Sequence, residues 1–123
     1  MPPPDRPALD VALVAAGGAL GSVARWWLAS LPGPWPTLVA NITGCFVLGL
    51  LSGWLLVHRP RLRRFAGIGF LGGYTTFSTH LLDAQRLAGD NLLSALAYVA
   101  GTLVLCLAAA AAGLSAGRRL ERR

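Results

Sequence analysis

Acidic residues, lysine and cysteine are scarce or missing in this sequence. Five of the 123 residues are Asp or Glu, and the eleven basic residues are all arginine, which gives a formal net charge of +6. Most arginines are clustered, which indicates loops rather than a nucleic-acid surface. The two cysteines, Cys45 and Cys106, lie in separate apolar runs. They predict neither a four-ligand zinc site nor a disulfide framework, so packing is their default role.

Charge of either sign is too scarce for a soluble domain of this size. Charged residues make up 13% of the chain and hydrophobic residues 54%, whereas soluble domains carry about 25% charged residues. Four apolar runs, at 11–31, 37–57, 65–82 and 91–117, each approach or exceed the ~20 residues that cross a bilayer as a helix. None alternates as a membrane-barrel strand would. The start of the chain has no basic segment, which argues against a signal peptide.

These runs predict an all-α membrane protein with four transmembrane helices. The expected helices span about 9–31, 37–57, 62–88 and 91–117, within one domain at 9–117. Residues 1–8 are expected to be a disordered N-terminus, and residues 118–123 a basic C-terminal tail.

The arginines predict the orientation of the chain in the membrane. With four crossings, both termini and the loop between the second and third helices lie on one side. Nine arginines fall on that side, against Arg25 and Arg86 on the other. By the positive-inside rule, both termini are predicted to be cytoplasmic. The nine are Arg6, Arg59, Arg61, Arg63, Arg64, Arg118, Arg119, Arg122 and Arg123.

Glycines recur at a spacing of four, which brings small residues to one face of a helix. In lipid, such pairs let helix backbones approach closely. Tight packing within the chain is the simplest interpretation, and the same faces are also expected to mediate oligomerisation, at least to a dimer. The pairs are Gly17 and Gly21, Gly49 and Gly53, Gly69 and Gly73, and Gly113 and Gly117.

The third run combines adjacent glycines with a cluster of hydroxyl residues. Each glycine weakens a helix by about 1 kcal/mol relative to alanine, and Ser and Thr compete for backbone hydrogen bonds. The helix is therefore predicted to break near Thr75, at mid-membrane. Irregular backbone at that depth lines an aqueous path or is buried in protein, so a transport site and a hydroxyl-rich packing interface both remain open. The residues concerned are Gly72, Gly73, Thr75, Thr76, Ser78 and Thr79.

Other polar groups in the apolar runs are neutral. Asn41 lies in the second run, and Tyr98, Thr102 and Cys106 follow one stripe of the fourth. Each is also explained by packing. Because no Asp or Glu lies within the apolar runs, a proton relay or a carboxylate cation site is not predicted. Neutral donors, with Arg25 at a helix end, suit a small anion.

Three segments carry a resemblance to a known family. Residues 17–25, 37–46 and 69–79, which include the sequence Thr75-Thr76-Phe77-Ser78-Thr79, resemble the Fluc fluoride channels, also called CrcB. The resemblance implies an antiparallel dimer of four-helix chains, with two pores along its interface and a structural Na⁺ at its centre. It further implies passive fluoride export across the cell inner membrane, which prevents fluoride toxicity. No enzymatic activity is implied.

The resemblance also assigns roles to individual positions. It places the Na⁺ ligands at the backbone carbonyls of Gly72 and Thr75. It places the pore asparagine at Asn41, the pore phenylalanine at Phe77 and the vestibule arginine at Arg25. The full set expected along the fluoride pore is Asn41, Thr76, Phe77, Ser78, Thr79, His80, Tyr98 and Thr102.

Two features depart from the family pattern. His80 stands where the family has a second pore phenylalanine; a pore role and a packing role are both open for it. The nine-to-two arginine bias predicts one orientation, whereas many family members insert both ways. The partner in the dimer is therefore a second copy or an oppositely oriented homologue.

Three alternatives remain to the self-sufficient channel. The first is an obligate half of a heterodimer with a modified or silent pore. The second is a small multidrug-type exporter, and the third is a structural helper without transport. The exporter requires a membrane carboxylate, which the apolar runs lack.

Overall fold

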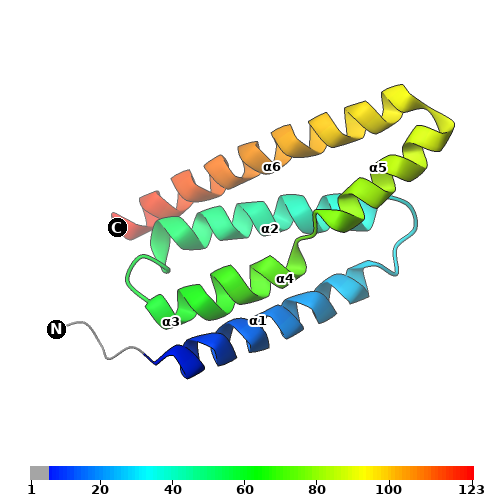
Figure 1. Ribbon diagram of the computed structural model, residues 1–123. Helices are drawn as coiled ribbons and strands as arrows, with labels where there is room; N and C mark the ends of the chain where they lie inside the picture. Colours follow the sequence, from blue (N-terminus) through cyan, green and yellow to red (C-terminus); the bar gives the residue numbers. More distant parts are fainter. Residues whose placement is uncertain (1–5) are drawn as a thin grey trace.

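The computed structural model describes residues 6–123, which form four helical segments joined by short turns (Figure 1). The first, second and fourth segments are α1 (Pro7–Leu28), α2 (Trp35–Trp54) and α6 (Leu92–Glu121). The third is a series of elements: α3 (Pro60–Leu62), the π-helical η1 (Arg63–Leu71), α4 (Gly72–Tyr74) and α5 (Ser78–Asp90). Within residues 6–123, α1, α2 and α6 are long and apolar enough to cross a membrane.

Two boundaries differ from the prediction. Helix α1 begins at Pro7, inside the predicted disordered segment, because proline's fixed φ suits the first helical turn. Residues 1–5 lie outside the described part of the chain. Helix α6 continues through Glu121, so most of the predicted basic tail is helical. Arg118 and Arg119 in its last turn interact favourably with the helix dipole.

The third segment is not one continuous helix. Helix α4 ends at Tyr74, the backbone of Thr75 is extended with ψ of 158°, and α5 begins at Ser78. None of its pieces has the length of a membrane-spanning helix. The fourth crossing, predicted at 62–88, therefore stays a prediction.

Glycines bring two pairs of helical segments into backbone contact. A Cβ on Gly17 would collide with the Phe65 carbonyl of η1, and one on Gly113 with the Phe46 carbonyl of α2. All eight glycines of the spacing-four pairs face backbone atoms of the same chain in this way. The expectation that these faces also mediate oligomerisation is therefore wrong, because intrachain contacts already occupy them.

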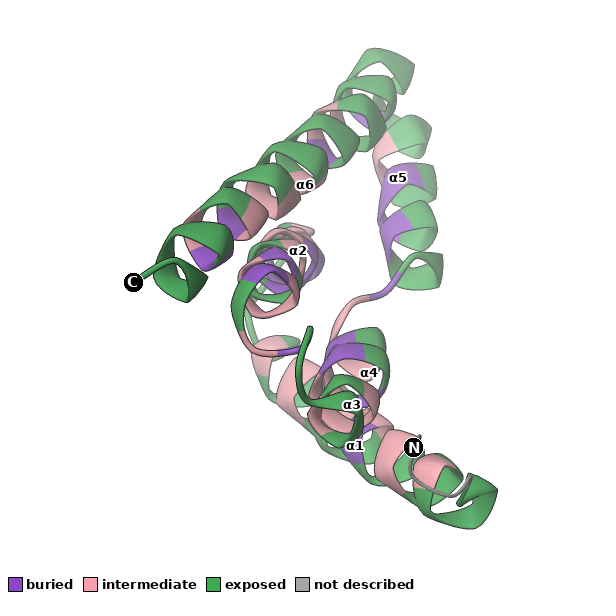
Figure 2. Cartoon of the chain, turned by 90° about the vertical axis from the view of Figure 1, so that its left-hand side faces the viewer, coloured by how far each residue is buried: buried purple, intermediate pink, exposed green. Residues whose placement is uncertain are grey.

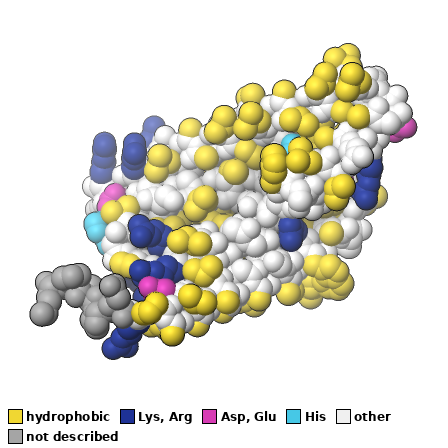
Figure 3. All heavy atoms as spheres, viewed as in Figure 1, with side chains coloured by type: hydrophobic (Ala, Val, Ile, Leu, Met, Phe, Trp, Pro, Cys, Tyr) yellow, Lys and Arg dark blue, Asp and Glu magenta, His cyan; other side chains and the backbone are white. Residues whose placement is uncertain are grey.

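The chain has little interior of its own. In the end-on view of Figure 2, buried residues form narrow stripes on the longer helices and most of the ribbon is exposed. Among the described residues, no large side chain is fully buried. The outer surface is rich in hydrophobic side chains, and most arginines gather where α1 begins and α6 ends (Figure 3). Such a surface suits lipid along its length and water at its basic end.

Candidate functional site

A groove lies between α2, the interruption of the third segment and α6. Its volume is about 430 Å³, and we call it the central groove. The structure brings together here seven of the site residues predicted from the sequence: Asn41, Gly72, Thr75, Thr76, Phe77, His80 and Thr102. The other lining residues are Cys45, Val99, Leu103 and Cys106.

Asn41 holds the interruption against α2. Its Nδ2 donates to the Thr76 carbonyl at 2.9 Å, and its Oδ1 accepts from the Thr76 N–H at 2.8 Å. Both residues are buried, and each buried polar group left unpaired would cost about 1–3 kcal/mol. The amide thus takes the place of the helical partners of Thr76. An amide nitrogen carries two N–H groups, so one donor of Asn41 remains for a ligand.

The same contacts remove the helical donors of two carbonyls. In a continuous helix, the N–H of Thr76 would donate to Gly72, and that of Thr79 to Thr75. Here the Thr76 N–H goes to Asn41, and the Thr79 N–H to the Thr76 hydroxyl at 3.3 Å. Both residues with displaced donors, Gly72 and Thr75, line the central groove. Backbone carbonyls released in this way are suitable ligands for Na⁺.

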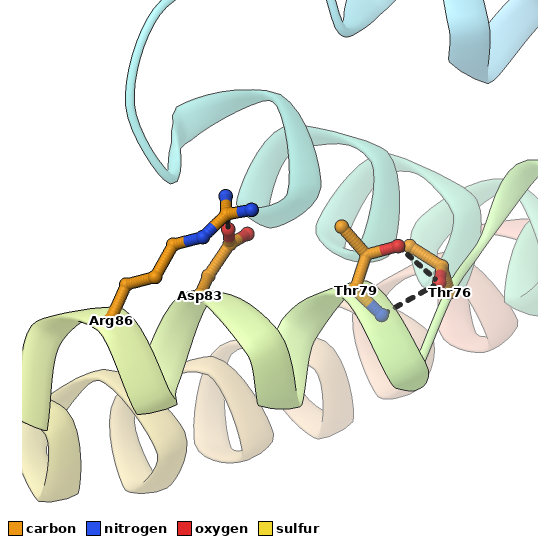
Figure 4. A network of polar contacts seen from close by, with 4 residues as sticks. All are labelled: Thr76, Thr79, Asp83 and Arg86. Carbon is orange, nitrogen blue, oxygen red and sulfur yellow. Dashed lines mark hydrogen bonds and ion pairs between the residues drawn. The ribbon is translucent and has the colours of Figure 1, made fainter.

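The hydroxyl groups after the interruption stabilise the start of α5. The Thr76 hydroxyl contacts the Thr79 hydroxyl at 3.0 Å and accepts from the Thr79 backbone (Figure 4). The second bond gives a partner to the Thr79 N–H, one of the first N–H groups of α5, which have no partner within the helix. Ser78 and Thr79 are exposed and do not line the groove. Their place along the fluoride pore stays a prediction.

An aromatic cluster stands at the start of α5. The Phe77 ring is 74% exposed, with its centroid 6.5 Å from the His80 ring. The His80 ring is buried, 4.7 Å from that of Tyr98 on α6. Within the described residues, His80 Nδ1 and the Tyr98 hydroxyl have no hydrogen-bond partner. The Thr102 hydroxyl donates to the Tyr98 carbonyl at 2.6 Å, so its proton is engaged.

Besides Ser78 and Thr79, two predicted site residues lie outside the lining of the central groove. Tyr98 is near it through its contact with His80, but is not part of its lining. Arg25 lies in the last turn of α1 and is likewise not a lining residue.

The carboxylate of Asp83 is buried, which the hydropathy of the sequence does not indicate. This carboxylate follows the apolar run that ends at residue 82, yet it is only 7% exposed. Its Oδ1 lies 3.6 Å from Nη1 of Arg86 (Figure 4), and its Oδ2 has no hydrogen-bond partner in the described part of the chain. The available signal was its spacing of three from His80, which places both residues on one helix face.

Comparison with known proteins gives one consistent match. The family model of the CrcB-like proteins (Camphor Resistance, CrcB) matches residues 12–114. Fluoride-specific ion channel FluC 2 of Nocardia farcinica is 43% identical, over 94% of this chain and 89% of the relative. FluC 1 of Rhodococcus jostii is 48% identical, over 89% of this chain and 86% of the relative. FluC of Paracoccus denitrificans is 47% identical, over 87% of this chain and 93% of the relative. This likeness extends over nearly all of the described helices and includes every residue of the central groove, and the chain therefore belongs to the CrcB family.

Proposed function

We propose that this chain is a subunit of a passive, fluoride-selective channel that exports fluoride across the cell inner membrane. The relatives named above are fluoride-specific ion channels, and members of this family are channels rather than enzymes. The observation that carries the proposal is the pairing of Asn41 with the Thr76 peptide. This pairing sets an amide donor, an irregular backbone and an exposed phenyl ring along one groove.

The chemistry of the central groove suits a small, hard anion. Among the described residues, no Asp or Glu lines it, so an anion meets no like charge there. The free N–H of Asn41 can donate to the anion, and the edge of the Phe77 ring carries a partial positive charge. The unpaired Tyr98 hydroxyl is a further donor close by. Fluoride is strongly hydrated and requires such donors in place of water, whereas larger anions are excluded by the bore.

A structural Na⁺ is proposed at the interruption, which we place at mid-membrane. Gly72 and Thr75 are the proposed ligands, through the carbonyls whose helical donors are engaged elsewhere. The ion would fix the irregular backbone without taking part in transport. Two carbonyls per chain are too few for a cation at this depth, so two chains together would supply about four.

The proposed assembly is therefore an antiparallel dimer. The Phe77 ring is 74% exposed beside the central groove, and a second chain laid against this face would cover it. The partner is a second copy or an oppositely oriented homologue. In the heterodimer, the groove of this chain is either conducting or silent.

Asp83 is the observation that favours a multidrug-type exporter, since such a protein requires a buried carboxylate. However, Asp83 lies close to Arg86 and is not a lining residue of the central groove. A cationic drug in the groove would lack a counter-charge, and we therefore prefer the fluoride channel.

Fluoride efflux from liposomes that contain only this chain tests the proposal. Passive efflux without ATP or a proton gradient is expected, and chloride should not substitute for fluoride. Efflux only after co-reconstitution with a homologous chain would identify an obligate heterodimer. Drug export coupled to protons would identify the exporter instead.

Orientation gives a first prediction. Because nine arginines lie on one side and two on the other, nearly all copies should insert with both termini cytoplasmic. Reporter enzymes fused after Arg123, one active only outside and one only inside the cell, measure this directly. Comparable populations on both sides would contradict the bias and support a self-sufficient homodimer.

His80 gives a second prediction, on pH dependence. Its ring is packed against Tyr98 of α6. The charged groups on its own helix are Asp83, Arg86 and Asp90. Neutral imidazole offers one N–H, whereas imidazolium offers two and adds a charge. If protonation strengthens fluoride binding by ~1.4 kcal/mol, release slows about 10-fold. Flux should therefore fall as the pH is lowered and the imidazole takes up a proton.

The measurement is fluoride efflux at several pH values, all well above the acidity at which HF crosses lipid unaided. His80→Phe, which restores the family residue, should remove the pH dependence. An identical pH profile in the variant would assign His80 to packing alone.

A further inference from the structure

The parallel packing of α2 and α6 places the two cysteines opposite each other. Along this interface, Gly49 faces the carbonyl of Ala110, and Gly53 that of Leu114. From the first contact to the second, each helix advances by four residues, so the two helices run parallel and stay in register. One turn earlier in the same register are Cys45 on α2 and Cys106 on α6, and the Cys106 thiol has the Cys45 thiol as a neighbour.

Both cysteines line the central groove and are half-buried. Cys45 lies one helical turn beyond Asn41, and Cys106 one turn beyond Thr102. Asn41 and Thr102 also line the groove. The thiols therefore continue the same wall, and an ion held between them would occupy the groove itself.

We propose that Cys45 and Cys106 form a two-coordinate binding site for a soft, thiophilic divalent metal ion of the Hg²⁺ class. Thiolates select soft metals. Zinc would require about four ligands, and the described residues contain no cluster of three or more metal-binding side chains. A site with two ligands instead suits an ion that prefers linear coordination.

Charge decides between soft ions. On binding, the two S–H bonds break, two S–Hg bonds form, and two protons pass to solvent. The product is a neutral bis-thiolate. A monovalent soft ion would leave a net charge of −1 at this place, which is costly in an apolar surrounding. The geometry and the surroundings therefore both favour the divalent ion.

Occupation of this site should block the central groove. This consequence rests on the proposed fluoride channel, whereas the metal site itself does not. Fluoride is a hard anion with little affinity for a soft metal that already has two thiolates, so the expected effect is obstruction.

The test uses the full-length chain, purified under reducing conditions and then treated with mercuric chloride. Native mass spectrometry should show one mercury per chain in place of two protons, and thiol titration should show that both thiols are lost. In each single variant, Cys45→Ser or Cys106→Ser, only one thiolate remains to bind mercury. A competing small thiol should then remove it at a concentration about 100-fold lower, because the second thiolate no longer holds it.

Fluoride efflux is measured in parallel, with and without mercury, and compared within each variant. The parent should lose efflux on adding mercury and regain it with excess dithiol. Efflux from the variant that combines Cys45→Ser with Cys106→Ser should not respond to mercury. Two mercury ions per chain, or one shared between two chains, would overturn the site. One bound mercury with unchanged efflux would overturn the block. If the parent conducts no fluoride, either alone or with a homologous partner chain, the channel proposal fails while mass spectrometry still decides the site.

Discussion

Asn41→Asp is expected to abolish fluoride flux and to destabilise the interrupted segment. In the parent, the amide donates to the Thr76 carbonyl and accepts from its N–H. A carboxylate can accept but cannot donate, so one of its oxygens would face the carbonyl oxygen of Thr76. The lost bond and the unpaired carbonyl cost about 1–3 kcal/mol, and the buried charge adds to that. The same charge repels an anion in the central groove.

Asn91→Asp is the matched control. The Asn91 side chain only accepts a hydrogen bond there, from the Leu93 N–H at 2.9 Å, at the start of α6. Aspartate accepts equally well, and its charge is favourable at a helix N-terminus. We therefore expect parental folding and flux from Asn91→Asp, against no flux from Asn41→Asp.

The readouts are fluoride efflux from liposomes and the midpoint of unfolding in a denaturing detergent, followed by circular dichroism. Parental efflux from folded Asn41→Asp would remove Asn41 from the conduction path. A parental unfolding midpoint would show that its pairing with Thr76 contributes little to stability.

Gly113→Ala is expected to weaken the packing of α2 against α6. The new Cβ would collide with the Phe46 carbonyl and approach the Leu50 nitrogen to 2.8 Å. Both are backbone atoms, which cannot move aside as a side chain could. Overpacking of this kind costs about 1–3 kcal/mol. Because the same interface aligns Cys45 with Cys106, mercury binding should weaken as well.

Gly101→Ala on the same helix is the control. A Cβ on Gly101 meets no atom within 4 Å, and alanine favours a helix over glycine by up to ~1 kcal/mol. The unfolding midpoint should therefore fall for Gly113→Ala and stay level or rise for Gly101→Ala. Equal midpoints for the two variants would contradict the close backbone contact between α2 and α6.

Hydropathy and spacing determined the local properties of this chain. The apolar runs predicted four membrane-spanning helices, and three of them, α1, α2 and α6, have the length and composition of membrane spans. This much is local, because crossing a bilayer depends on the length and polarity of one segment. The family, too, followed from motifs within single segments, and the comparisons confirm it. Helix ends were placed less well. Helix α1 begins at Pro7 because proline suits a first helical turn, and α6 runs through Glu121 because charged residues can continue a helix.

Only the tertiary structure decided which segments meet. The sequence contained the glycine pairs, but not that α1 packs on η1 and α2 on α6. It contained Asn41, but not its pairing with Thr76, 35 residues away. The burial of Asp83 and the register that sets Cys45 beside Cys106 were likewise hidden. Periodicity shows which residues share a face of a helix, whereas the partner of that face depends on the register between distant segments, which no local pattern encodes.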